Sequence, residues 1–91
     1  MKIQRPASAG QRSRWDCQVD VEPAPEGAGL TVEIESTVGT LFDAVQRAAL
    51  EEHLKALEVT EGRIRVIDDG ALDYVLRARL ECALVRAAGE E

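Results

Sequence analysis

The spacing of apolar side chains along this chain changes between about two and about 3.6 residues, and this change restricts the possible folds most. Apolar and polar residues alternate in "CQVDVE" (17–22) and "LTVEIE" (30–35), which predicts two strands that each bury one face. Ser36 or Thr37 can cap a following helix, because "VGTLFDAVQRAALEEHLKAL" (38–57) is apolar at helical spacing.

The same two periods recur in the second half of the chain. "RIRVI" (63–67) predicts a third strand, and "ALDYVLRARLECALVRAA" (71–88) predicts a second helix that Gly89 ends. Strands with one apolar face need helices to cover it, so we expect an α+β two-layer sandwich in the order β-β-α-β-α. Two helices would cover one face of a three-stranded sheet. The expected core contains Leu30, Val32, Ile34, Val45, Ile64, Val66, Leu72, Leu76 and Leu80.

The polar face of this sheet carries opposite charges on different strands. The first two strands present acidic residues, whereas the third presents Arg63 and Arg65. Opposite charges on neighbouring strands attract each other. We therefore expect the third strand to lie beside an acidic one.

The first 16 residues show no periodicity, and we call this segment the N-terminal arm. The lack of periodicity predicts that the arm is flexible and contains no strand. We expect residues 17–91 to form a single α+β domain. The arm carries a charge of about +3 and the rest of the chain about −9, within a net charge of −6. The charged residues of the arm are Lys2, Arg5, Arg12, Arg14 and Asp16.

Length and composition exclude several classes of function. The chain has 91 residues and a single histidine, His53, which we expect on a helix surface, so no catalytic site is predicted. Cys17 and Cys82 are too few for a disulfide framework or a zinc site, so we expect core thiols in a reducing, cytoplasmic setting and no metal. No signal peptide or membrane span is apparent. The pI of about 4.8 argues against nucleic acid as a partner.

Three stretches carry a resemblance to a known family. "DDGALDYVLRARLECALVRA" (68–87) resembles the C-terminal signature of the citrate lyase acyl carrier protein, the gamma subunit of that enzyme. "MKIQRPASAG" (1–10) and "ESTVGTLF" (35–42) resemble its opening and the stretch before its first helix. The resemblance covers nearly the whole chain. An ordinary four-helix acyl carrier is excluded, because its Asp-Ser-Leu motif does not occur here.

The resemblance implies a carrier without catalytic chemistry of its own. One serine of the arm would bear 2'-(5''-phosphoribosyl)-3'-dephospho-coenzyme A, attached by a prosthetic-group transferase. The thiol of this group would hold the acetyl or citryl thioester while citrate is cleaved to oxaloacetate and acetate. The implied partners are the alpha (acyl transferase) and beta (citryl lyase) subunits. A tether raises the effective concentration of the thioester at both partner sites.

The chain departs from the family's pattern at the serine itself. The family's serine lies four residues after an Ala-Gly pair, and Gly or Ser and then Asp follow it. Counting from Gly10, the serine position is Arg14, Trp15 replaces the small residue, and Asp16 is kept. Ser13, one residue earlier, is the candidate for covalent attachment, because a loop serine is found by the transferase rather than by strand register.

Several alternatives stay open. Ser8 or Ser36 could be the attachment site instead of Ser13. The chain could also be a degenerate, unmodified paralogue, a small α+β protein-interaction module, or the carrier of a malonate decarboxylase or citramalate lyase type of complex. Arg12 and Arg14 either pair with the phosphates of the incoming donor or are plain surface charges.

Two further side chains also have more than one interpretation. Trp15 either docks on the sheet as a lid or stacks on the adenine of the prosthetic group. Arg79 lies near the apolar stripe of its helix and is expected to meet a carboxylate, with Asp68 or Asp69 as the candidates.

Overall fold

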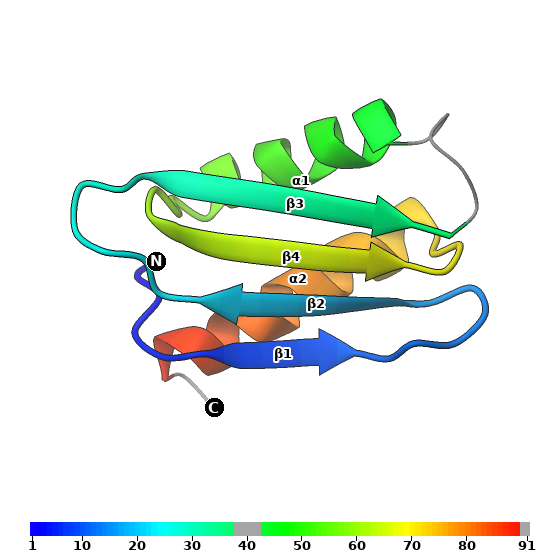
Figure 1. The fold of residues 1–91 in the computed structure, drawn as a ribbon, viewed down its shortest axis with the longest axis horizontal. Helices are drawn as coiled ribbons and strands as arrows, with labels where there is room; N and C mark the ends of the chain where they lie inside the picture. The colour runs from blue at the N-terminus through cyan, green and yellow to red at the C-terminus, as the bar shows by residue number, and fades with distance from the viewer. Residues whose placement is uncertain (38–42, 90–91) are drawn as a thin grey trace.

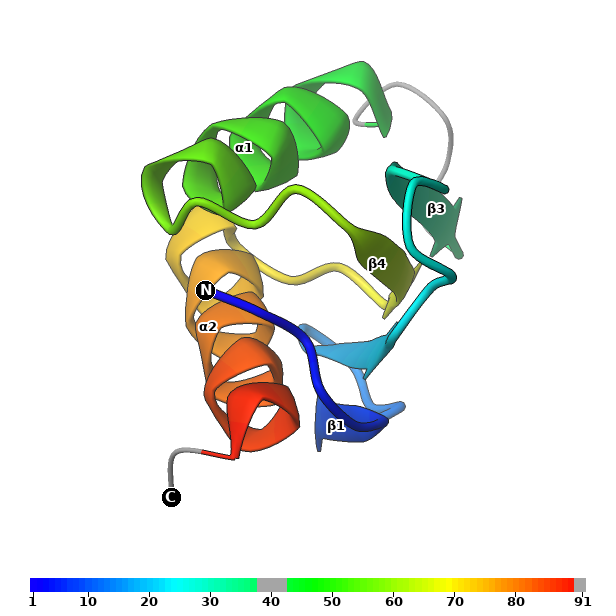
Figure 2. The same ribbon diagram turned by 90° about the vertical axis from the view of Figure 1, so that its left-hand side faces the viewer.

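The computed structural model describes residues 1–37 and 43–89, and its elements form two layers. A sheet makes one layer, and both helices pack against the same face of it (Figures 1 and 2). The α+β two-layer class is therefore confirmed. The elements are β1 (Ala7–Gly10), β2 (Cys17–Glu22), β3 (Leu30–Ser36), α1 (Asp43–Ala56), β4 (Gly62–Asp68) and α2 (Asp73–Ala88).

The sheet has the strand order β1-β2-β4-β3. The strand β4 is antiparallel to β2 and parallel to β3, to which α1 connects it. Arg65 of β4 lies opposite Asp20 of β2 on one side and Glu33 of β3 on the other. The expectation that this strand lies beside an acidic one is confirmed on both sides.

The prediction of three strands and a strand-free N-terminal arm is wrong, because residues 7–10 form the edge strand β1. This strand pairs with β2 in antiparallel register, from Ala7 opposite Val21 to Gly10 opposite Gln18. Its sequence, "ASAG", contains only small residues, so it gives no alternating hydrophobic signal. Ile3 is buried as well, which ties the start of the arm to the core.

The end of β1 requires glycine. Gly10 has φ of +87°, in the left-handed region that side chains with a Cβ disfavour. A Cβ at this position would collide with the carbonyl oxygen of Cys17. The hairpin between β1 and β2 therefore closes tightly where the two strands begin to separate.

The core lies between the sheet and the inner faces of the helices. The buried apolar residues of α2 are Leu76, Leu80, Ala83, Leu84 and Ala87, which confirms the predicted core positions Leu76 and Leu80. Val45 and Leu72 were expected in the core but are 66% and 58% exposed. Helix α1 buries its later residues Ala49, Leu50 and Leu54 instead.

The predicted start of the first helix lies outside the described residues, and its cap therefore stays a prediction. Ser36 is the last residue of β3, and the described part of α1 begins at Asp43. The backbone N–H of Thr37 donates to the carbonyl of Asp68 at 2.9 Å, which extends the pairing with β4 by one residue. The predicted helical residues 38–42 lie outside the described residues.

The two cysteines occupy different environments. Cys17 is fully buried in β2, and this burial raises the pKa of its thiol to about 12. The expectation of a core thiol is therefore confirmed for Cys17 and wrong for Cys82, which is exposed on α2. His53 is half-buried rather than on an open surface, and its Nε2 lies 3.4 Å from Oε1 of Glu81.

No helix within residues 1–37 and 43–89 has the length and apolar character needed to cross a membrane.

Candidate functional site

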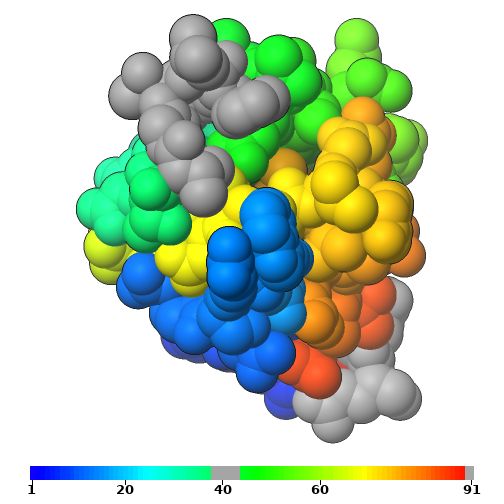
Figure 3. Space-filling model, turned by 90° about the vertical axis from the view of Figure 1, so that its right-hand side faces the viewer, coloured from blue at the N-terminus to red at the C-terminus, as the bar shows by residue number. Residues whose placement is uncertain are grey.

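The segments that carry the predicted site residues lie together at one end of the sheet. β1 ends there at Gly10, β2 begins at Cys17, and β3 and β4 end at Ser36 and Asp68. The connection between β1 and β2, residues 11–16, is named the serine loop here. Figure 3 views the molecule from this end, where the connection between β1 and β2 (blue) lies against the connection between β4 and α2 (yellow).

A β-turn presents Ser13 at the surface. The backbone N–H of Asp16 donates to the carbonyl of Ser13 at 3.1 Å, which closes the turn over Arg14 and Trp15. Trp15, in the third position, has φ of +68°, the value that this position of a type II turn requires. Ser13, Arg14 and Trp15 are all exposed.

The Ser13 hydroxyl has no hydrogen-bond partner within the described part of the chain. A serine becomes a strong nucleophile when a general base accepts its proton. None of the described histidine or carboxylate side chains bonds to Ser13. The site therefore exposes a hydroxyl, and no described side chain is bonded to it as a general base.

The serine loop is fixed to the turn after β4. The N–H of Trp15 donates to the carbonyl of Asp69 at 3.0 Å, and the N–H of Asp69 donates to the carbonyl of Asp16 at 2.9 Å. Arg12 adds a side-chain contact, from its Nε to Oδ2 of Asp69 at 2.8 Å. The hydrogen bond from Arg12 lowers the pKa of Asp69. Backbone and side chains thus hold the two connections together.

A second ion pair holds the end of the serine loop on α2. Arg79 donates from Nε to Oδ1 of Asp16 at 3.1 Å and from Nη2 to Oδ2 at 2.9 Å. The backbone N–H of Cys17 also donates to Asp16 Oδ1, at 2.8 Å. These hydrogen bonds lower the pKa of Asp16, and those from Arg79 have the largest effect. The expected partners of Arg79, Asp68 and Asp69, were wrong.

We expect Asp16→Asn to make folding stability less sensitive to acid. The pKa of Asp16 is lower in the folded protein than in the unfolded chain, so its stabilisation is present above the unfolded value and disappears as pH falls through the folded value. The midpoint of urea unfolding should therefore fall less steeply in Asp16→Asn than in the wild type between about pH 5 and pH 2. Equal slopes in the two proteins would contradict this role of Asp16.

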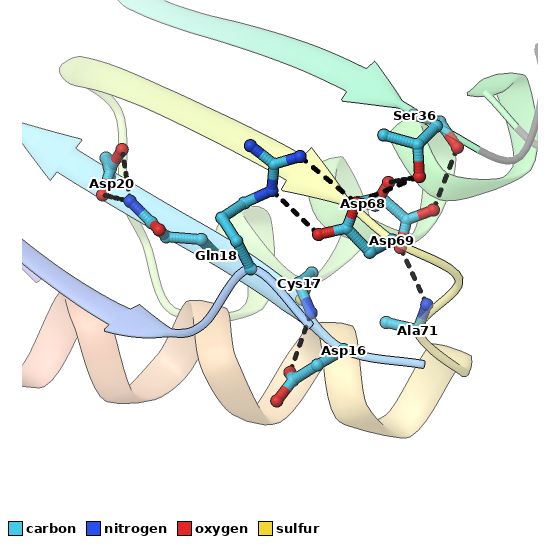
Figure 4. Close-up of polar contacts among 10 residues, drawn as sticks. Asp16, Cys17, Gln18, Asp20, Ser36, Asp68, Asp69 and Ala71 are labelled. Atoms are coloured by element: carbon cyan, nitrogen blue, oxygen red, sulfur yellow. Dashed lines mark hydrogen bonds and ion pairs between the residues drawn. The ribbon is translucent and has the colours of Figure 1, made fainter. Parts of the chain in front are cut away.

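Asp68, at the end of β4, bonds to β3, to α1 and to the turn that leads into α2. Its buried carboxylate accepts hydrogen bonds from Ser36 Oγ at 3.1 Å, Gln46 Nε2 at 2.8 Å and the N–H of Ala71 at 2.9 Å. Figure 4 shows Asp68 and Asp69 next to each other at the end of β4, with Ser36 and Ala71 reaching them. The bond to Ala71 forms the turn that leads into α2. Asp68 therefore stabilises the turn between β4 and α2, to which the serine loop is bonded.

The predicted cofactor-binding residues Arg12, Ser13 and Arg14 lie on one loop, but the two arginines have different partners. Arg12 pairs with Asp69, whereas the Arg14 guanidinium lies over the Trp15 ring, 5.1 Å from its centroid. Of the alternative serines, Ser8 lies on β1 and Ser36 bonds to Asp68. An anionic ligand can therefore reach the hydroxyl of Ser13 and the guanidinium of Arg14 without breaking an ion pair.

An apolar groove of about 380 Å³ lies beside the serine loop. Sequence patterns did not identify it, because Val45 and Leu72 have the spacing of core residues and Gln46 carries no motif. Its lining combines the serine loop, α1 and the start of α2: Trp15, Val45, Gln46, Asp68, Gly70, Ala71, Leu72, Asp73 and Leu76.

Among residues 1–37 and 43–89, no group of three or more histidine, cysteine, aspartate or glutamate side chains is placed to hold a metal ion.

Comparison with known proteins gives a consistent picture. The family profile described as "Malonate decarboxylase delta subunit (MdcD)" matches residues 4–87. The citrate lyase acyl carrier protein of Enterobacter sp. (strain 638) is 44% identical over 91 residues, covering 100% of this chain and 92% of that protein. The protein of the same name from Vibrio cholerae serotype O1 (strain M66-2) is 39% identical over 87 residues, covering 96% and 88%.

A solved structure has the same fold. It is a chain of a Pseudomonas malonate decarboxylase hetero-tetramer in complex with malonate, with a TM-score of 0.78 and 21% identity. The match covers 96% of this chain and 92% of that one.

Proposed function

Because the chain belongs to the family of citrate lyase acyl carrier proteins, we propose that it carries a covalently bound 2'-(5''-phosphoribosyl)-3'-dephospho-coenzyme A on Ser13. The family makes it an acyl carrier subunit of a multisubunit enzyme. The observation that carries the assignment of Ser13 is its exposed hydroxyl, which has no partner within the described residues, on a turn held in place from both sides.

The residues of the turn fit the attachment of a phosphodiester. The Ser13 oxygen would form the new bond to phosphorus, and a phosphate leaving group of an activated donor would depart with the electrons of the broken P–O bond. The hydroxyl proton would pass to a base of the transferase, since the described residues supply none. Arg14 would offset the negative charge of the donor, because a guanidinium pairs well with phosphate.

The proposed partners follow from the role of a carrier. The thiol of the bound group would supply the thioester chemistry, and the alpha and beta subunits of a citrate lyase would act on that thioester. This chain would hold the attachment point in a fixed place and leave bond cleavage to its partners. Citrate is favoured over malonate, because the citrate lyase relatives are 39% and 44% identical and the malonate decarboxylase chain is 21% identical.

We expect Arg14→Glu to slow the attachment roughly tenfold at low salt, because exposed charges steer a polyanionic donor. The advantage of the wild type should shrink as salt rises, since ions screen exposed charges. The rate is measured by intact-mass spectrometry with the cognate transferase. Lys2→Glu is the matched control, because it makes the same change of charge in the N-terminal arm outside the serine loop. Equal rates for the two variants would mean that Arg14 is a plain surface charge and does not steer the donor.

The proposed function is tested by the intact mass of the protein purified from its native host. A mass increase equal to the phosphoribosyl-dephospho-coenzyme A group, mapped to the peptide that contains Ser13, is expected. An unmodified chain would overturn the proposal in favour of a degenerate paralogue or an interaction module. Adding the modified chain to carrier-free citrate lyase subunits should restore citrate cleavage, and failure there would overturn the choice of substrate.

A further inference from the structure

Exposed apolar side chains gather beside the serine loop. Of the large hydrophobic side chains that the described residues expose, Trp15, Val45 and Leu72 line the groove next to that loop, and Tyr74 alone does not. Monomeric proteins rarely leave such groupings in contact with water unless a ligand or partner covers them.

Trp15 also has an unfavourable backbone. Its φ of +68° lies in the region that favours glycine, and its side chain is 65% exposed. An exposed indole at such a position gains little from the fold in return for this strain. Strained residues of this kind concentrate at functional sites, so Trp15 points to a ligand.

We infer that the groove binds the adenine base of the prosthetic group, with Trp15 as its stacking surface. This inference rests on the proposed attachment to Ser13. In that group a single phosphoribosyl unit separates the serine from the adenosine, so adenine is the planar ring that comes nearest to the attachment point. Trp15 is two residues from Ser13 in the same turn, and it faces the groove that it lines.

The chemistry of the groove suits a purine linked to phosphates. Bases stack on aromatic side chains with a gain that depends little on the base. The Arg14 guanidinium, 5.1 Å from the indole centroid, supplies a cation beside this stacking surface, and a guanidinium pairs well with phosphate.

Gln46 adds a polar feature to this apolar lining. Its side chain is 8% exposed. Nε2 donates to Asp68, while Oε1 has no hydrogen-bond partner among the described residues. An unpaired buried acceptor costs stability until a donor reaches it, and the exocyclic amino group of adenine is such a donor.

Trp15 is the only tryptophan of the chain, so its fluorescence reports on the groove directly. Unmodified protein is titrated with dephospho-coenzyme A and, separately, with phosphopantetheine, which lacks the adenosine. We expect dephospho-coenzyme A to quench Trp15 and phosphopantetheine to leave it unchanged. The modified protein should show the same quenching without added ligand. Equal effects of the two ligands, or an unquenched modified protein, would overturn the inference.

A pair of variants tests the stacking itself. Trp15→Gly removes the indole and relieves the strained φ, so the turn is kept. By calorimetry it should bind dephospho-coenzyme A about fivefold or more weakly than the wild type, as expected for the loss of one aromatic stacking surface. Tyr74→Ala removes an equally exposed aromatic ring outside the groove and should bind like the wild type. Equal affinity of Trp15→Gly and the wild type would overturn the inference.

These measurements separate the inference from the proposed function. If Ser13 is modified but Trp15 fluorescence does not change, the carrier function stands and the adenine site is wrong. If dephospho-coenzyme A quenches Trp15 in a chain that is never modified in its native host, the groove binds adenine nucleotides but the attachment to Ser13 is wrong.

Discussion

Replacing Ser13 with alanine is expected to abolish attachment of the prosthetic group while the protein keeps its fold. Ser13 is exposed, and its hydroxyl makes no hydrogen bond within the described residues. The substitution therefore removes the acceptor oxygen without leaving a buried group unpaired. Intact-mass spectrometry after incubation with the cognate transferase should show no mass increase. The thermal unfolding midpoint should equal that of the wild type.

Two further variants make this result specific. Ser8→Ala should be modified at the wild-type rate, because Ser8 lies on β1 rather than on the turn. The double variant Ser13→Ala, Arg14→Ser moves the hydroxyl to the position that the family's pattern predicts. Its modification would show that the transferase accepts either position of the turn. Modification of Ser13→Ala alone would place the attachment site elsewhere.

Replacing Leu76 with alanine is expected to cost about 2–5 kcal/mol of folding stability, the usual loss for a buried leucine. Leu76 is 1% exposed and lies on the face of α2 that covers the sheet. Domains of this size are marginally stable, so the loss is a large share of the total. The unfolding midpoint should fall by about 10 °C or more, as measured by calorimetry.

Leu72→Ala is the matched control for this experiment. It is the same substitution four residues earlier, at a side chain that is 58% exposed. Its cost should lie within about 0.5 kcal/mol of zero, as for other surface substitutions. Similar costs at both positions would mean that the buried face of α2 is assigned wrongly.

The strands and the second helix could be predicted because their patterns are strong and local. Alternation in β2, β3 and β4 and the stripe of α2 each repeat over at least six residues. β1 escaped prediction because its side chains are too small to give a pattern, and pairing with β2 rather than its own composition makes it a strand. Val45 and Leu72 were assigned to the core because helical spacing shows which residues share a face but not where a helix begins. Leu72 is the N-cap residue that precedes α2, and Val45 lies in the first described turn of α1.

The candidate site could be predicted only in part. The motif placed Ser13, Arg12 and Arg14 in one segment, and the structure keeps them on one loop. The partner of Arg79 could not be predicted, because Asp16 is 63 residues away. That contact depends on β1, which turns the supposed free arm into a hairpin whose closing loop lies on α2.

The anchoring of the serine loop decides how a carrier of this kind moves its cargo. Both ends of the loop continue into paired strands, Asp69 pairs with Arg12 near its start, and Arg79 pairs with Asp16 at its end. Motion of the polypeptide therefore adds little to the distance that a group attached to this loop can cover. Under the proposed attachment to Ser13, the length of the prosthetic group would set the working radius, and partner active sites would have to lie within that radius of one fixed point on the surface. A longer journey would require the whole domain to turn between its partners.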